Sequence, residues 1–311
     1  VETAGLPLAT VAEAKGGAGA DLGDAMAILR EAGRAAVPVP LAETMLAAWM
    51  LAESGLEVPR GPLAIAAAPL SLTRAGSGWR VAGTAHGIAW ARQCERLVVL
   101  ARDAEGARIA LVPLVQAAIT RGANLAGEPR DTVRLADAVP ERVAAAGAGV
   151  EAATLLRFGA LARAAQMAGA LEAVLELTVR YANERVQFGR PLARFQAIQQ
   201  QVAVLATNVA AAGVACDAAI AAAAAGSGEL AIAAAKARIN EAATAAAAIA
   251  HQVHGAMGFT AEHPLHRFTT RLWAWREEFG DESFWWARLG ATAAEAGADG
   301  LWPLLARAAG A

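Results

Sequence analysis

The strongest constraint on the fold is a series of long segments without proline in the second half of the chain. Residues 154–188, 195–225 and 229–256 each lack Pro and carry few Gly. As a helix with a rise of 1.5 Å per residue, the first segment would be about 50 Å long. Helices of this length bury their apolar sides against one another, so the sequence predicts a helical bundle.

Alanine-rich stretches inside these segments, 210–225 and 242–250, resemble low-complexity sequence. Alanine is the best helix former, and its small side chain lets two helices approach closely. We therefore interpret both stretches as packed helices, separated by a turn at Gly226-Ser227-Gly228.

The first part of the chain has a different character. Apolar residues recur at helical spacing over 24–55, where Pro38 and Pro40 divide the run into two helices. Short β-prone runs punctuated by glycine then follow, at 63–67, 79–82, 97–101 and 109–115.

This order predicts an α+β fold of three domains. We expect an N-terminal helical domain at 1–60, a middle β domain at 61–148 and a C-terminal four-helix bundle at 149–311. By itself, this architecture is compatible with many functions.

Charge and composition exclude several classes of function. A net charge of −2 and a pI near 6.3 leave no basic stripe for nucleic acid. The apolar share of 56% is largely alanine, and we expect no membrane span. Cys94 and Cys216 are far apart, which favours neither a disulfide framework nor a thiolate metal site. The cysteine content is consistent with a reducing cytoplasm, and we find no export signal in the sequence. The chain starts at Val1 and not at Met, so we expect that some N-terminal sequence precedes it.

The first motif that could carry chemistry is YANERVQFGRPLARFQAIQ, residues 181–199. A helix is expected to end at Phe188-Gly189, and a second to begin near Phe195, so Arg185, Arg190 and Arg194 surround one corner. Arginines grip phosphate and an aromatic ring can cover a flat ligand, which suits a nucleotide cofactor. From residue types alone, a helix hairpin with solvated arginines is the simpler interpretation.

The second motif is HQVHGAMGFTAEHPLH, residues 251–266. Gly255 and Gly258 would end the preceding helix and expose backbone amides beside Gln252, where a pyrophosphate or an adenine could approach. Pairs of histidines spaced three apart also suggest a metal. There is no HExxH order, however, and Glu262 is the only suitable carboxylate nearby, so a helix cap with surface histidines is favoured and no metal is expected.

Together the two motifs resemble the acyl-CoA dehydrogenase family. The first is similar to that family's R-x-Q-F-G-x-P-L segment followed by F-Q, and the second to its Q-x-x-G-x-x-G-F-x-x-E segment, in the expected order. The N-terminal run GGAGADLGDAMAILREAGRAAVPVPLAET is more weakly similar to the first helical domain of the family.

The resemblance implies an oxidoreductase that uses FAD to convert an acyl-CoA thioester into the α,β-unsaturated enoyl-CoA, with electron-transfer flavoprotein as electron acceptor. FAD would lie between the middle domain and the bundle, partly in a site of a neighbouring subunit. The residues that would face it are Arg185, Phe188, Gln196, Gln252, Gly255 and Gly258.

The base that removes the α-proton is not found where the resemblance places it. Gly280 occupies the usual position of the catalytic Glu, and Gly159 occupies the alternative position used by some relatives. Nearby acids could replace the base after a shift of one or two residues, with Glu278 first among them, although a surface acidic turn is simpler. They are Glu277, Glu278, Asp281 and Glu282.

The middle domain departs from the family pattern as well. The loop around Ala67 and Pro69 lacks the family's T-E-P-x-A-G-S-D sequence, and Ala89 replaces the hydroxyl that usually meets flavin N5. These losses resemble the degenerate subunit of heteromeric dehydrogenases, in which a partner chain supplies the Glu. Bacterial enzymes of that kind often act on CoA thioesters of steroids or other bulky polycyclic acids.

Three hypotheses follow. The favoured one is an FAD-dependent dehydrogenase subunit that needs a second, catalytic subunit. The second is a self-sufficient homo-oligomeric dehydrogenase with Glu278 or a nearby acid as base, and the third is a non-redox scaffold or CoA-ester binding protein. Retention of Arg185, Gln196 and Gln252 favours the first over the third.

Overall fold

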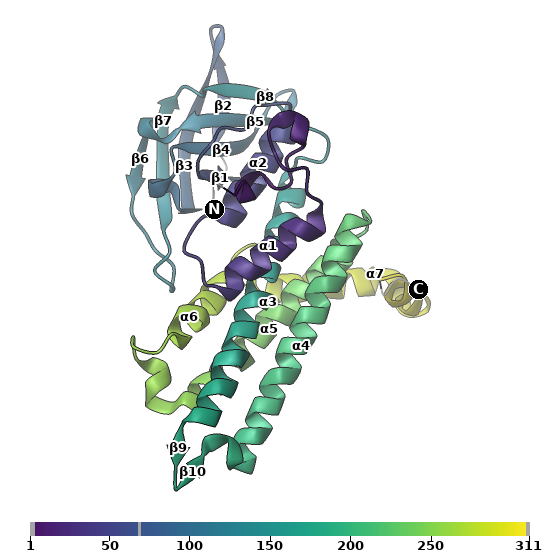
Figure 1. The fold of residues 1–311 in the computed structure, drawn as a ribbon. Coiled ribbons are helices and arrows are strands. Elements are labelled where there is room, and N and C mark those ends of the chain that lie inside the picture. The colour runs from purple at the N-terminus through teal and green to yellow at the C-terminus, as the bar shows by residue number, and fades with distance from the viewer. Residues whose placement is uncertain (1–3, 68–69, 309–311) are drawn as a thin grey trace. The chain divides into compact units, whose positions relative to one another are not determined.

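The computed structural model describes residues 4–67 and 70–308, and side chains up to residue 306. The chain divides into two compact units (Figure 1). The first comprises residues 1–25 and 38–159, and the second comprises residues 26–37 and 160–311. The order of helices, then strands, then helices confirms the predicted α+β class.

The N-terminal region contains the short 3-10 helices η1 (Leu6–Leu8) and η2 (Glu13–Lys15), followed by α1 (Leu22–Arg34) and α2 (Leu41–Glu53). Pro38 and Pro40 separate α1 from α2, as their fixed φ predicts. Helix α2 is buried over most of its length because it packs in the first unit, against β1 and η1.

The middle of the first unit is built of two four-stranded sheets, with strand orders β1-β4-β5-β8 and β2-β3-β7-β6. All pairs are antiparallel except β1 with β4. Apolar side chains from both sheets form one core, including Val81, Val99 and Val133. The strands are β1 (Leu63–Ala66), β2 (Ser71–Ala75), β3 (Gly78–Ala89), β4 (Arg96–Asp103), β5 (Gly106–Pro113), β6 (Ala117–Thr120), β7 (Arg130–Ala138) and β8 (Arg142–Ala145), with η3 (Ala91–Gln93) and η4 (Leu114–Gln116) between them.

The second unit is helical. Its long helices, α3 (Ala152–Glu184), α4 (Gln196–Ala224) and α5 (Glu229–His254), agree with the three Pro-free segments to within four residues at each end. Small residues allow close contact between α1 and α3, because a Cβ on Gly33 would lie 1.9 Å from the carbonyl oxygen of Gln166. The remaining elements are β9 (Val186–Gln187), β10 (Arg190–Pro191), η5 (Leu192–Arg194), η6 (Gly255–Phe259), α6 (Leu265–Arg276) and α7 (Glu282–Ala308).

Helix α4 differs from the expectation that no segment is long and apolar enough to span a membrane. Among the described helices, α4 alone meets that criterion, by length and composition only. Its hydropathy comes mainly from alanine, and its buried side, including Leu205 and Cys216, packs largely on α5. The core helix of a soluble protein meets the same criterion, so this feature is weak evidence for a membrane.

Candidate functional site

The first motif forms a sharp corner between α3 and α4. Strands β9 and β10 pair as a short hairpin whose two turn residues, Phe188 and Gly189, have φ of 52° and 77°. Positive φ at both central residues is typical of a type I′ turn. The ring of Phe188 is 92% exposed and lies edge-on to Phe195, with their centroids 6.2 Å apart. The turn therefore presents an aromatic ring to the exterior of the unit.

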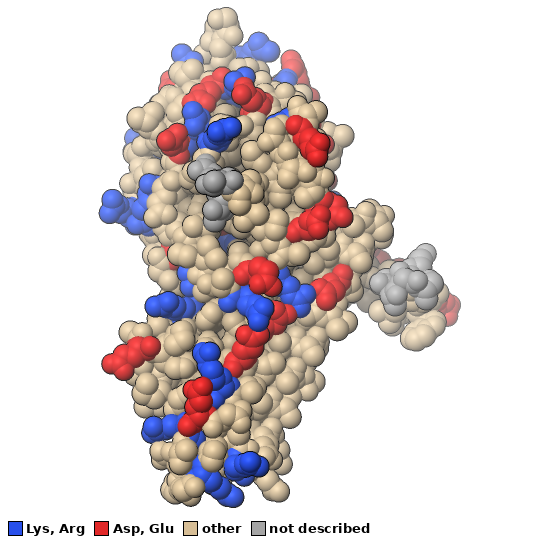
Figure 2. Space-filling model, in the orientation of Figure 1, with Lys and Arg blue, Asp and Glu red and all other residues tan. Residues whose placement is uncertain are grey.

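Three exposed arginines surround this corner. The Arg190 guanidinium lies 4.2 Å from the centroid of the Phe195 ring. Neither Arg185 nor Arg194 forms an ion pair within the described part of the chain, so their charges are available to an anion. Basic side chains mark the lower end of the face drawn in Figure 2, where β9 and β10 lie in Figure 1. Gln196 is exposed at the first turn of α4.

The second motif ends α5 in a glycine turn. Gly255 has φ of 57° and nothing within 4 Å of the place that a Cβ would take, whereas a Cβ on Gly258 would lie 2.9 Å from the His254 Cβ. Both positions therefore favour glycine, for different reasons. The side chain of Gln252 is exposed one turn earlier. This end of α5 offers open backbone and an amide side chain.

Stacked aromatic rings bring the two motifs to one end of the helical unit. Tyr181 of α3 stacks on His254 of α5 with a centroid distance of 4.4 Å, and His254 lies 4.6 Å from His263. His251 stacks on Phe259 and accepts or donates a hydrogen bond at Thr269 Oγ1, 3.0 Å away. The side chains of His254 and His251 lie directly beside Gly258 of the glycine turn.

These histidines are buried or half-buried, not on the surface as expected. His251 and His254 are 7% and 2% exposed. Nδ1 of His251 and Nε2 of His254 have no hydrogen-bond partner in the described part of the protein. No cluster of three or more metal-ligating side chains occurs among the residues that the structure describes.

The buried histidines predict an acid-sensitive fold. Desolvation lowers the pKa of His251, His254 and His263 below 6.5, so the native state favours their neutral forms. Their contribution to stability is present above pH 6.5 and is lost as the pH falls below it, because the unfolded chain then binds more protons. Urea unfolding between pH 5 and 8 should show this loss as a fall in the free energy of unfolding. His254→Phe should make the free energy of unfolding depend less steeply on pH. An unchanged pH dependence in His254→Phe would show that His254 is not a cause of the loss.

The residue at the expected position of the base lies in a tight turn between α6 and α7. Phe279 and Gly280 have φ of 54° and 98°. Trp285 Nε1 donates a hydrogen bond of 3.1 Å to the Phe279 carbonyl, and Trp285 is 1% exposed. A Cβ on Gly280 would lie 2.6 Å from both Trp285 Nε1 and Phe284 Cδ1. Packed aromatic rings thus fill the space beside Gly280.

All four acids near this turn have partners. Glu278 accepts a hydrogen bond of 2.7 Å from Nε of Arg163, which is 3% exposed. Asp281 Oδ1 accepts from the Phe284 amide at 2.8 Å and so caps the first turn of α7. Glu277 and Glu282 both pair with Arg276.

Lys236 is a buried residue that the sequence alone did not single out. Its Nζ lies within hydrogen-bonding distance of four oxygens that share its protons: the carbonyl oxygens of Trp275, Arg276 and Gly280 at 3.3, 3.0 and 3.2 Å, and Asn240 Oδ1 at 2.9 Å. Burial lowers its pKa to about 7 despite the nearby Glu278. One sequence feature could have drawn attention to Lys236: it is one of two lysines in the chain, and it lies within an alanine-rich helix.

Other positions singled out from the sequence lie in the first unit. Gly159 is buried in α3, and Ala89 ends β3, where it pairs with Arg130 of β7. The loop that we predict to lack the family's flavin-binding sequence includes Pro69, which lies outside the described residues.

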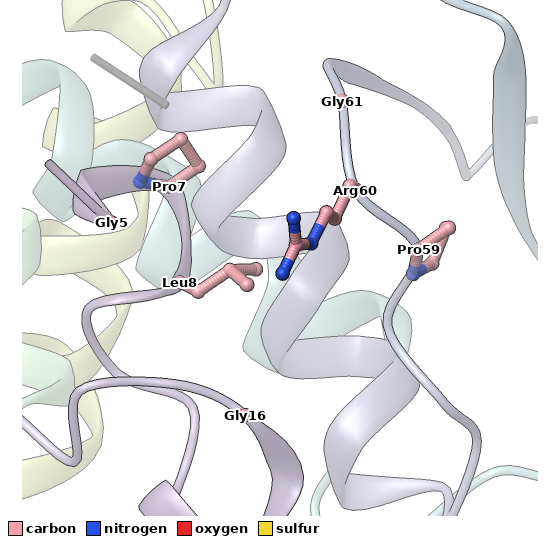
Figure 3. A pocket seen from close by; sticks show the side chains of 7 residues that line it. All are labelled: Gly5, Pro7, Leu8, Gly16, Pro59, Arg60 and Gly61. Atoms are coloured by element: carbon pink, nitrogen blue, oxygen red, sulfur yellow. The ribbon is translucent and has the colours of Figure 1, made fainter. Parts of the chain in front are cut away.

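The first unit also contains a cavity of about 590 Å³ that the sequence did not indicate. The side chain of Arg60 points into it (Figure 3). Its other walls come from Pro59, Gly61 and the segment around η1.

Comparison with known proteins places these features in context. Residues 146–282 match the family model described as acyl-CoA dehydrogenase, C-terminal domain. The chain is 31% identical over 274 residues to acyl-CoA dehydrogenase IpdE2 of Mycolicibacterium smegmatis, covering 87% of this chain and 78% of that protein. For IpdE2 of Mycobacterium tuberculosis the identity is 33% over 280 residues, covering 87% and 77%.

Solved structures show the same fold. The ChsE4-ChsE5 complex from Mycobacterium tuberculosis matches with a TM-score of 0.86 and 26% identity, covering 94% of this chain and 86% of that one. The Tcur3481-Tcur3483 steroid ACAD matches with a TM-score of 0.81 and 28% identity, covering 94% and 87%. The fold expected from the sequence, with N-terminal helices, a middle β region and C-terminal helices, is confirmed.

Proposed function

Because this chain belongs to the acyl-CoA dehydrogenase family, we propose that it is the FAD-completing subunit of a heteromeric acyl-CoA dehydrogenase. The complex oxidises an acyl-CoA thioester to the α,β-unsaturated enoyl-CoA, and a partner chain supplies the catalytic Glu. The observation that carries this proposal is the closed turn at Gly280, where the neighbouring acids already have partners.

The exposed residues of the helical unit fit part of an FAD site. Arg185 offers a guanidinium without an ion pair among the described residues, which suits a pyrophosphate oxygen. Phe188 offers an exposed ring, and Gln196 and Gln252 offer amide donors and acceptors. Gly255 leaves its backbone open to close approach.

When bound, FAD supplies the acceptor for the hydride that leaves the β-carbon of the thioester. The residues of this chain hold its phosphates and adenosine in place. Arg185 neutralises negative charge, and the Phe188 ring covers a planar group. Tyr181 and His254, stacked beneath the glycine turn, keep that turn rigid.

Removal of the α-proton requires an unengaged carboxylate within reach of the substrate. Glu278 is the best candidate in this chain, yet it is paired with the buried Arg163. Release of that carboxylate would leave a buried guanidinium without its charge partner, at a large cost. This arrangement supports a structural role for Glu278 and a base on another chain.

The names of similar proteins support the heteromeric arrangement. Two of the solved relatives are a ChsE4-ChsE5 complex and a Tcur3481-Tcur3483 steroid ACAD, each named for two proteins. We extend this to the present chain and propose a bulky polycyclic substrate such as a steroid CoA thioester. The proposal also includes electron-transfer flavoprotein as acceptor and a cytoplasmic location.

A self-sufficient homo-oligomer that uses Glu278 is the second candidate, and its carboxylate is the observation in its favour: it is only 18% exposed and lies two residues from Gly280. A non-redox scaffold is less well supported, because the exposed arginine and glutamine set at the corner would then have no ligand to bind.

Removal of the Arg185 guanidinium tests the cofactor-binding role. In the complex co-expressed with a neighbouring dehydrogenase subunit that carries the Glu, Arg185→Ala should weaken FAD binding by about 1.5–3 kcal/mol, or about tenfold or more, because one charge-assisted contact is lost. Visible absorbance after gel filtration measures the retained flavin.

The matched control is Arg288→Ala, since Arg288 pairs with Glu229 and is also exposed. That variant should retain the parent's flavin content. Equal flavin occupancy in Arg185→Ala and the parent complex would argue against the assigned role.

A further inference from the structure

We infer that the turn at Phe279-Gly280 is closed by its own chain, so that a glutamate at position 280 cannot act as a base. Trp285 and Lys236 are the residues that hold it closed. This inference rests on the proposed function and explains it further. The side chains packed around the turn exclude a base at position 280, in addition to the absence of a carboxylate there.

Gly280 leaves no room for a side chain. At φ of 98°, Gly280 has a backbone conformation that L-residues rarely adopt. Any side chain there would also overlap Trp285 Nε1 and Phe284 Cδ1, each 2.6 Å from the Cβ position. Phe284 is 38% exposed and has room to rotate, but Trp285 is 1% exposed and is fixed by the packing around it.

Hydrogen bonds from Trp285 and Lys236 fix the backbone of the turn. Trp285 Nε1 holds the Phe279 carbonyl, and Lys236 Nζ holds the next carbonyl, that of Gly280. Lys236 also binds the last carbonyls of α6, at Trp275 and Arg276. Two donors on different helices therefore fix consecutive peptide groups, which prevents the turn from reopening to admit a side chain.

Charged side chains already surround the turn. The groups that act on the Lys236 ammonium are Arg163 of α3, together with Glu277, Glu278 and Glu282 in and after the turn. Arg163 pairs with Glu278, and Arg276 pairs with Glu282. A new carboxylate at position 280 would enter a site that already holds three glutamates and in which both arginines are paired.

The test compares two glycines of similar backbone conformation. Gly226, in the turn before α5, has φ of 79° and nothing within 4 Å of its Cβ position. Gly226→Ala should therefore lower the Tm by about 2–4 °C from backbone strain alone, and Gly280→Ala by at least about twice that shift. Equal shifts would overturn the inference, since they would mean that the space beside Gly280 is open.

A second variant covers the case in which Gly280→Ala does not fold. Trp285→Phe removes the indole donor to the Phe279 carbonyl but keeps a ring in the core, and Trp286→Phe is the control, because Trp286 is 52% exposed. Hydrogen exchange in peptides covering residues 276–283 should rise about two- to tenfold in Trp285→Phe only, as the turn loses a net contribution typical of one hydrogen bond. Unchanged exchange would overturn the assignment of Trp285.

The final arm uses chemistry and separates the inference from the proposed function. The complex is prepared with a partner chain whose catalytic Glu is replaced by Gln, so that the FAD site is complete and only the base is missing. This chain carries either Gly280 or Gly280→Glu, and both complexes are mixed with butyryl-CoA, palmitoyl-CoA or a steroid CoA thioester. We expect flavin bleaching by the Gly280→Glu complex to stay within twofold of the Gly280 complex. Bleaching that appears only with Gly280→Glu overturns the inference, whereas rapid bleaching with Gly280 overturns the proposed function and leaves the Tm and exchange comparisons to decide the inference.

Discussion

Purified alone and supplied with excess FAD, this chain should oxidise acyl-CoA thioesters at least about 10²-fold more slowly than the complex with its catalytic partner. A positioned general base usually contributes about 10²–10⁴-fold, and the lone chain also holds only part of the FAD site. The turn that would carry the base presents Gly280 instead, and the carboxylate of Glu278 is paired with Arg163. Stopped-flow absorbance of the flavin measures the two rates directly.

The variant Glu278→Gln tests whether the base lies on the partner or on this chain. In the complex, Glu278→Gln should keep the parent rate to within a few fold, because the base is on the partner. A loss of about 10² or more in Glu278→Gln would instead assign the base to Glu278 and support the self-sufficient enzyme.

Breaking the buried pair beneath the turn should have the largest effect on stability. Arg163→Met leaves the Glu278 carboxylate without its nearest cation in a site where Arg163 is 3% exposed and Glu278 is 18% exposed. Removal of one partner of a buried ion pair typically costs about 3–5 kcal/mol. Urea unfolding, followed by circular dichroism, should show a matching fall in the free energy of unfolding.

Two comparison variants test whether the loss of charge pairing causes the lower stability of Arg163→Met. Arg34→Met removes a cation that pairs with Glu176 at the surface, so it should leave the unfolding midpoint almost unchanged. The double variant of Arg163→Met and Glu278→Leu should recover much of the lost stability, because no uncompensated charge stays buried. If the double variant is no more stable than Arg163→Met, lost packing rather than lost charge pairing is responsible.

The helices could be predicted from the sequence more completely than the strands. The three long helices follow from alanine-rich segments without proline, and α5 is directly flanked by Gly228 and Gly255. Strands β2, β6, β7 and β8 were not identified. β7 alternates charged and apolar residues in a nine-residue strand, and β6 and β8 have only four residues each, so their pairing depends on the rest of the sheet.

The corner with Arg185 and the glycine turn at Gly255 could be located from their motifs. The stacking of Tyr181 on His254 that brings them together could not, because it depends on how α3 packs beside α5. The contacts around Gly280 could not be predicted from the sequence either. Lys236 lies 44 residues before it in the chain, and no local pattern relates a lysine in an alanine-rich helix to a distant turn.

Native mass spectrometry of the co-expressed pair tests the central claim most directly, because it counts chains and flavins in one intact assembly. We predict a hetero-oligomer that contains fewer FAD molecules than chains, since each chain of this type supplies only part of a site. An active homo-oligomer with one FAD per chain would contradict the account.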